Sequence, residues 1–167
     1  VMQGIISAFD IALWDICGKF YKTPVYNLLG GKCRDRIRTY TYIYDLEAQG
    51  GLRAAAGSWT TDPDRLAVLA AGLVDEGFTA LKFDPVPQQK LKQGMRPPFE
   101  LSLAEYEHAD KAVGAIRDAV GNRADILIGT HGQITPSAAR RLAARIEHHD
   151  PLWLEEPCPP ENYQQMG

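Results

Sequence analysis

The stretch SLAEYEHADKAVGAIRDAVGNRADILIGTHG, residues 102–132, decides the fold class of this chain. Its first residues include Ser102 and Glu105, the S-x-x-E pattern of a capping box, in which each side chain binds a backbone N–H of the other residue at a helix N-terminus. The helix is predicted to extend to Val120 and to end before Gly121. A short apolar segment at residues 126–128 then predicts a buried strand. The stretch is therefore one helix-to-strand step of an α/β protein.

The same step recurs on both sides of this stretch. Asp62-Pro63 and Thr135-Pro136 each predict a helix N-cap followed by a proline in the first turn, and Gly77 predicts the end of the first of these helices. The other predicted strands, rich in apolar, aromatic or β-branched residues, lie at residues 37–44, 78–83 and 152–154. The predicted order after residue 36 is βαβαβαβ.

Short strands that are apolar on both faces and alternate with amphipathic helices are typical of a parallel sheet. Two architectures fit this order, a (β/α)8 barrel and a doubly wound sheet. No G-x-G-x-x-G or G-x-x-x-x-G-K-[ST] motif follows a predicted strand, which argues against dinucleotide and P-loop proteins. The pattern thus favours a partial (β/α)8 TIM-type barrel of about four βα units.

The first part of the chain has a different organisation. Apolar residues recur at helical spacing over residues 3–20 and predict an amphipathic helix that needs a partner to cover it. Thr23-Pro24 predicts a capped short helix at residues 25–29, which Gly30-Gly31 would end. We expect residues 1–36 to belong to one domain and residues 37–167 to another.

Composition limits the classes of partner. The chain has 167 residues, of which 45% are hydrophobic and 23% charged, and a formal net charge of −3. This charge offers no basic face for nucleic acid, and no long apolar run predicts a membrane span, so the expected partner is a small molecule. The three cysteines form no C-x-x-C pair, which favours reduced thiols and a cytoplasmic protein.

Ionisable residues stand where three of the predicted strands end. Lys82 and Asp84 end the second strand, His131 follows the third, and Glu155 and Glu156 end the fourth. The carboxyl ends of parallel strands collect at one edge, where α/β enzymes have their active sites. A cation, an imidazole and carboxylates at one edge can hold a hard metal ion and exchange protons with a substrate. Alternatively, Lys82 forms a structural ion pair with one of the two glutamates.

Two further groups of residues carry side chains that can bind ligands. The long loop at residues 85–101 carries cations that can meet a substrate carboxylate or simply face solvent, namely Lys90, Lys92 and Arg96. The remaining histidines fall on predicted helices and are expected at the surface, namely His108, His148 and His149.

The chain resembles the mandelate racemase and muconate lactonizing group of the enolase superfamily. The motifs that carry the resemblance are SAFDIALWDICGKFYKTPVYNLLGG at residues 7–31, GFTALKFDP at residues 77–85 and LWLEEPCPPEN at residues 152–162. The resemblance implies that residues 1–36 are the C-terminal helices of an α+β capping domain. It also implies that residues 37–167 are the first half of the barrel.

The resemblance further implies a Mg2+ site made by carboxylates that end strands three, four and five, where an enediolate is stabilised after a proton is removed next to a carboxylate. Glu155 matches the strand-four ligand. Gly129 stands where the strand-three aspartate is expected, and glycine offers no ligand atom. Either Asp84 or His131 completes the metal site, or the site is altered, or the metal is lost.

The other candidate residues are also placed by the resemblance. Lys82 matches the first lysine of the family's K-x-K motif, where it is expected to bind or polarise the substrate carboxylate. Asp84 replaces the second lysine, which excludes a lysine base there; Asp84 is expected to orient Lys82 or accept a proton. His131 matches the histidine that protonates a departing hydroxyl in galactonate and mannonate dehydratase-like members. Glu156 is the candidate substrate-binding residue.

These expectations together predict part of a Mg2+-dependent sugar-acid dehydratase. A complete (β/α)8 barrel takes about 250 residues, so the chain is expected to supply only part of one. The remaining ligands and acid-base groups would then lie outside this chain, and the intact protein is expected to be a homo-oligomer. The alternatives are a cycloisomerase or an epimerase of the same superfamily, a noncatalytic half barrel, and a small doubly wound binding domain.

Overall fold

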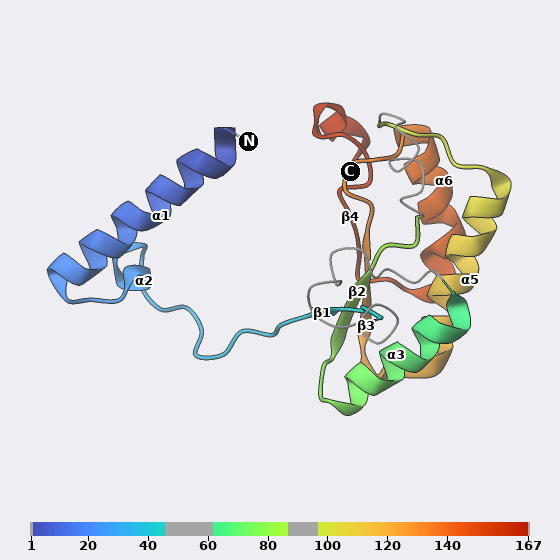
Figure 1. Cartoon of the computed structure of the whole chain (residues 1–167), viewed down its shortest axis with the longest axis horizontal. Coiled ribbons are helices and arrows are strands. Elements are labelled where there is room, and N and C mark those ends of the chain that lie inside the picture. The colour runs from blue at the N-terminus through green and yellow to red at the C-terminus, as the bar shows by residue number, and fades with distance from the viewer. Residues whose placement is uncertain (1, 46–61, 87–96, 167) are drawn as a thin grey trace. The chain divides into compact units, whose positions relative to one another are not determined.

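The structure is a computed structural model that describes residues 2–45, 62–86 and 97–166. It divides into two compact units, Val1–Arg38 and Thr39–Gly167, and each is described by itself (Figure 1). The boundary lies two residues after the one predicted from the sequence. The assignment of the first unit to a capping domain stays a prediction.

The first unit consists of helix α1, Met2–Tyr21, and the four-residue helix α2, Val25–Leu28. The apolar stripe predicted on α1 is exposed; Phe9, for example, is 69% exposed. The predicted cap at Thr23 is wrong by one residue, because Pro24 occupies the N-cap position and no side chain caps the helix. Thr23 Oγ1 instead accepts a hydrogen bond of 2.9 Å from the Asn27 side chain.

The second unit is built on a parallel sheet of four strands, each hydrogen-bonded to the next along the chain. The strands are β1 (Thr41–Tyr42), β2 (Ala80–Phe83), β3 (Asp125–Gly129) and β4 (Trp153–Glu155). Their order β1-β2-β3-β4 never reverses, whereas a doubly wound sheet changes direction at a switch point. The described strands therefore have the order of a (β/α)8 barrel, and the doubly wound alternative is wrong.

Strand β1 is much shorter than the predicted strand at residues 37–44. Its ladder pairs Thr41 with Leu81 and Tyr42 with Lys82, and Ile43 N–H adds a bond of 2.9 Å to the Lys82 carbonyl. Strand propensity alone cannot define a strand's length, because a residue becomes part of a strand only where a neighbouring strand accepts its hydrogen bonds.

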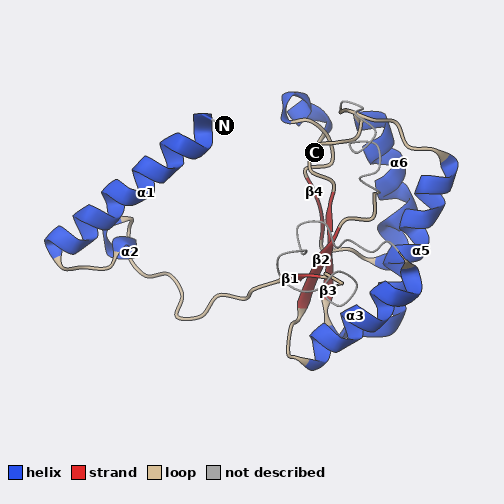
Figure 2. Ribbon diagram, viewed as in Figure 1, coloured by secondary structure: helices blue, strands red, loops and turns tan. Residues whose placement is uncertain are grey.

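Three helices connect the strands: α3 (Pro63–Asp75), α5 (Leu103–Val120) and α6 (Pro136–Ile146). Figure 2 shows them on the same side of the sheet. Short 3-10 turns follow at Gly121–Arg123 (η2), Glu147–His149 (η3) and Pro160–Gln165 (η4). One face of the sheet is thus covered by helices, as in half of a barrel wall.

The starts of α3, α5 and α6 are those that the sequence predicts. Asp62 accepts a hydrogen bond from Asp64 N–H, and Thr135 accepts one from Ala138 N–H. Ser102 and Glu105 form both bonds of the capping box, at 3.2 Å and 2.6 Å. Because caps satisfy backbone donors that the helix itself cannot, they fix where each helix begins.

The core lies between the sheet and the helices. Alternate strand residues point toward the helices and are buried there, among them Leu81, Phe83, Ile126 and Ile128. They pack with the buried faces of the helices, including the fully buried Tyr106 of α5. No helix of the described residues is long and apolar enough to cross a membrane.

Candidate active site at the strand ends

The alternation along the strands places the candidate residues on the sheet face opposite the helices. Because Leu81 and Phe83 face the helices, Lys82 and Asp84 face the other way. Gly129 of β3 pairs in register with Glu155 of β4. The residues that the sequence predicts at the strand ends therefore lie together on the sheet face opposite the helices.

Lys82 and Glu155 form an ion pair between Nζ and Oε1. The Lys82 side chain is only 3% exposed, whereas that of Glu155 is 35% exposed. Burial alone would lower the pKa of Lys82, but the hydrogen bonds to Glu155 and Tyr42 outweigh it and raise the pKa. Lys82 is therefore protonated at neutral pH and cannot accept a proton from a substrate.

Asp84 and His131 form a second pair, in which Asp84 Oδ2 lies 2.8 Å from His131 Nε2. The Asp84 side chain is 3% exposed and that of His131 is 35% exposed. Asp84 Oδ1 is buried and has no hydrogen-bond partner in the described part of the chain. Buried polar atoms are nearly always paired, so an unpaired carboxylate oxygen at a strand end indicates a ligand that completes it.

Burial raises the pKa of Asp84 above its ordinary value. His131 and Lys82 act in the opposite direction and lower this pKa, while the nearby charge of Glu155 raises it further. The two carboxylates are thus close enough for one charge to oppose the other. A bound cation would relieve both the burial cost and this repulsion.

Asp84 also occupies the space in front of Gly129. A Cβ atom built on Gly129 would overlap Asp84 Oδ1, and it would lie 3.1 Å from Lys82 Cε. A side chain on β3 at this position and the observed Asp84 carboxylate exclude each other. The space that a ligand side chain at position 129 would fill is therefore occupied by the Asp84 carboxylate from the neighbouring strand.

The backbone after β3 and β4 is held in uncommon conformations. His131 has φ 54° and Glu156 has φ 45°, in the left-handed region that L-residues rarely adopt. Thr130 binds both segments, since its Oγ1 donates to the carbonyls of Glu155 at 3.1 Å and Glu156 at 2.7 Å. Gly132 N–H adds a bond of 2.8 Å to the Glu156 carbonyl. These bonds fix the direction from which His131 enters the site.

Glu156 differs from the other four candidates. It is exposed, and the contacts described for it involve its backbone carbonyl. Its role as a substrate-binding residue stays a prediction. The structure brings together Lys82, Asp84, His131 and Glu155.

Sequence reasoning missed the aromatic residues beside Lys82. Its Nζ lies 5.1 Å from the ring centroid of Tyr42 and 5.7 Å from that of Tyr40. Tyr42 is the register partner of Lys82, and such rings stabilise a buried ammonium group. The alternating aromatic residues of the predicted first strand were the signal that could have indicated them.

The loop cations and the remaining histidines lie outside the strand-end site or outside the described residues. Lys90, Lys92 and Arg96 lie outside the described residues. The surface prediction holds for His148, whose side chain is 63% exposed, but it is wrong for His149, which is 17% exposed. His108 is also partly buried, with a buried Nε2 atom.

The fold and the site define a class of protein, the βα barrels that carry polar groups at the carboxyl ends of their strands. Residues 65–167 match the family described as enolase C-terminal domain-like. The chain belongs to this family, as its motifs predicted.

Comparisons with individual proteins agree with this family assignment. The chain is 38% identical to the D-gluconate dehydratase of Thermoproteus tenax over 160 residues, which cover 95% of this chain and 28% of that protein. It is also 38% identical to the D-xylonate dehydratase of Haloferax volcanii, covering 95% and 35%. A mandelate racemase/muconate lactonizing enzyme from Jannaschia sp. CCS1 has a TM-score of 0.74 at 44% identity, covering 91% of this chain and 37% of that structure. The chain thus spans about a third of the length of these relatives.

The residues present fit the Mg2+ that the family generally binds. Mg2+ and similar hard cations prefer carboxylate oxygens, and the site offers Asp84 Oδ1, which is unpaired and buried, and the Glu155 carboxylate. His131 is bound by the other oxygen of Asp84, Oδ2. Because the His131 side chain is more exposed than that of Asp84, it can contact a substrate.

Proposed function

We propose that this chain is part of a Mg2+-dependent sugar-acid dehydratase, in which Asp84 and Glu155 hold the cation. The observation that carries the proposal is the unpaired buried oxygen of Asp84, in front of Gly129 and near Glu155. Dehydration is favoured over cycloisomerisation or epimerisation because the two named relatives are a gluconate dehydratase and a xylonate dehydratase. Mg2+, when bound, would stabilise the negative charge of the enediolate that forms after removal of the proton next to the carboxylate.

Lys82 is proposed to act as a fixed positive charge. Its raised pKa keeps it protonated, so it can attract a substrate carboxylate but cannot remove the α-proton. The base that removes this proton is proposed to lie in a part of the protein outside this chain. Lys82 is held in place by its ion pair with Glu155.

His131 is proposed to be the general acid that protonates the leaving β-hydroxyl. Histidine is the side chain most often used for proton transfer, and the Asp84 carboxylate, with Oδ2 2.8 Å from Nε2, orients the ring. Loss of water from the β-carbon of the enediolate gives an enol, which becomes a 2-keto-3-deoxy acid. Asp84 is thus proposed to contact both the cation and the general acid, with Oδ1 binding the cation and Oδ2 holding His131.

The test is an assay of the intact protein with D-gluconate, D-xylonate and D-galactonate. Formation of a 2-keto-3-deoxy acid supports the proposal, and conversion to an epimer that keeps the β-hydroxyl contradicts it. The variant His131→Asn should lower kcat at least about 100-fold, the usual size of a general-acid contribution, with little change in KM. The control His108→Asn replaces a histidine of α5 outside the site. Full dehydration activity in His131→Asn would show that the role given to His131 is wrong.

A further inference from the structure

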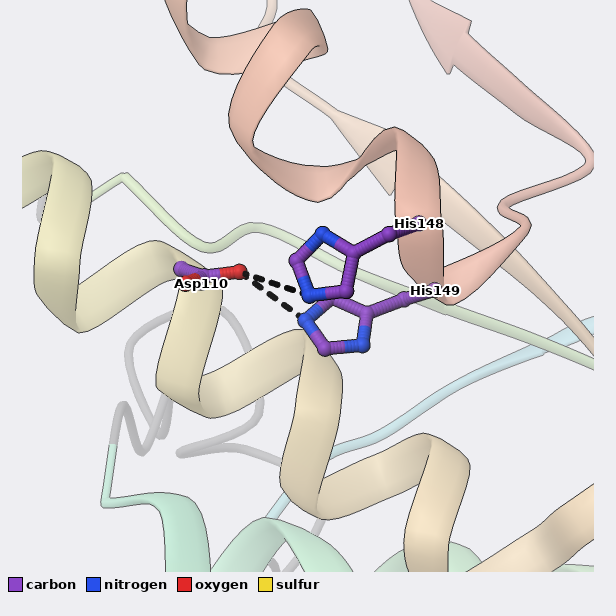
Figure 3. A group of neighbouring side chains, drawn as sticks. All are labelled: Asp110, His148 and His149. Atoms are coloured by element: carbon purple, nitrogen blue, oxygen red, sulfur yellow. Dashed lines mark hydrogen bonds and ion pairs between the residues drawn. The ribbon is translucent and has the colours of Figure 1, made fainter.

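A second group of possible metal ligands lies in the helix layer. Asp110 of α5 faces His148 and His149 of the turn η3, and Figure 3 shows the two histidine rings side by side, both directed toward Asp110. Asp110 Oδ1 lies 2.9 Å from His149 Nε2 and 3.7 Å from His148 Nε2. One ligand atom from each residue lies within 4.8 Å of the others.

These separations suit a small tetrahedral ion. Zn2+ bonds to imidazole nitrogen and carboxylate oxygen of about 2.0–2.1 Å place neighbouring ligand atoms about 3.3 Å apart. The two observed distances, 2.9 Å and 3.7 Å, lie on either side of this value. Each of these two distances differs from the ideal value by about 0.4 Å, so small side-chain movements would bring Asp110 to the separation that a bound ion requires from each histidine.

The turn that carries the histidines is fixed to α5. Arg117 donates hydrogen bonds of 2.9 Å to the carbonyls of both His149 and Asp150. The His149 ring lies against Gly114, where an added Cβ would come within 2.9 Å of its Cε1 atom. A glycine inside a helix is less favourable than alanine, and here it provides the space for the ring.

The ligand chemistry selects the class of metal. Two imidazoles and one carboxylate suit zinc and its neighbours in the first transition series, whereas Mg2+ prefers oxygen ligands alone. His148 is 63% exposed, so solvent can reach the group and supply a remaining ligand. We infer that Asp110, His148 and His149 form a Zn2+ site that joins α5 to the turn before β4.

The inference does not depend on the proposed dehydratase function, because the three residues belong to α5 and η3 and none of them contributes to the strand-end site. It is tested by Zn2+ binding to the full chain in the presence of saturating Mg2+, measured by equilibrium dialysis. We expect one equivalent of Zn2+ to remain bound. Substitution with Co2+ should give the intense visible absorption of a tetrahedral site.

The variants Asp110→Asn, His148→Ala and His149→Ala should each weaken Zn2+ binding by more than about 100-fold, since even changes behind the ligands typically cost 10–100-fold. The matched control Asp118→Asn removes an exposed carboxylate from the same helix and should bind as the wild type does. His148→Ala keeps the test decisive if His149→Ala does not fold, because His148 is largely exposed. Absence of Zn2+ binding by the folded wild type, or wild-type affinity in His148→Ala, would overturn the inference.

Discussion

Asp84 is a buried carboxylate whose Oδ1 has no hydrogen-bond partner among the described residues, and folded proteins rarely retain such a group. An unsatisfied buried polar atom costs about 1–3 kcal/mol. A residue that lowers stability in this way is a candidate for function, because perturbed ionisable groups concentrate at active sites.

Removal of this charge should therefore stabilise the metal-free protein. We expect Asp84→Asn to raise the free energy of unfolding at pH 7 by about 1 kcal/mol, because it removes a buried charge beside an unpaired oxygen. Burial raises the pKa of Asp84 in the folded state. Wild-type Asp84 thus becomes neutral more readily in the folded than in the unfolded state, and its unfavourable effect disappears as the pH falls through the folded-state pKa.

The advantage of Asp84→Asn should accordingly be largest at neutral pH and vanish in acid. Urea unfolding with a chelator present, repeated across this pH range, measures it. A variant that is less stable than the wild type at pH 7 would show that the Asp84 carboxylate is retained for its pair with His131.

Gly129 gives a second prediction at this scale. Gly129→Ala should lower the free energy of unfolding by about 1–3 kcal/mol, as overpacking does, because the added methyl group would overlap Asp84 Oδ1. In an Asp84→Gly background the same change should cost much less, which a double-mutant cycle measures. The control Gly72→Ala lies on α3 with no atom within 4 Å of the new Cβ, and it should be neutral or stabilising. Equal costs of Gly129→Ala in both backgrounds would contradict the steric link.

The sequence predicted which residues of the strand-end site are neighbours, but it did not predict how their side chains are arranged. Lys82, Asp84, His131 and Glu155 were predicted to be neighbours because the ends of parallel strands converge. That Asp84 lies in front of Gly129 depends on the strand register and on a side-chain direction, which a linear pattern does not contain. The contact of Tyr42 with Lys82 depends on the same register.

At the scale of elements, helix starts were predictable because their signals are local. The capping residues Asp62, Ser102 and Thr135 act within three residues of their own position. Strand limits were less predictable, because they depend on a distant partner. Strand β1 therefore covers only two of the eight residues predicted. The cap prediction at Thr23 was also wrong, because the short helix α2 begins one residue later than predicted.

The capping box of α5 allows a test at this scale. Ser102→Ala should lower the free energy of unfolding by about 1 kcal/mol, because it leaves a backbone N–H at the helix start without its acceptor. Ser102→Gly should cost only a few tenths of that, since glycine lets water reach the same donor. Denaturant midpoints of the two variants provide the comparison. A larger loss in Ser102→Gly than in Ser102→Ala would contradict this account of the cap.

At the scale of the whole molecule, the strand order distinguishes a barrel from a doubly wound sheet, and the sequence alone left both open. Helix and strand patterns are the same in the two folds, whereas the order β1-β2-β3-β4 depends on which strands pair. The chain covers 28% and 35% of its two dehydratase relatives. The proposed enzyme therefore needs further residues, and the noncatalytic half barrel stays an alternative for the 167-residue chain by itself.

The central claim is that Asp84 takes the place of the missing strand-three ligand, and Mg2+ titration of the intact protein by calorimetry tests it most directly. Asp84→Asn should weaken Mg2+ binding by more than about 100-fold, and Asp118→Asn should leave it unchanged. The double variant Asp84→Gly with Gly129→Asp, which returns the carboxylate to β3, should recover most of the affinity. Wild-type Mg2+ affinity in Asp84→Asn would contradict the claim.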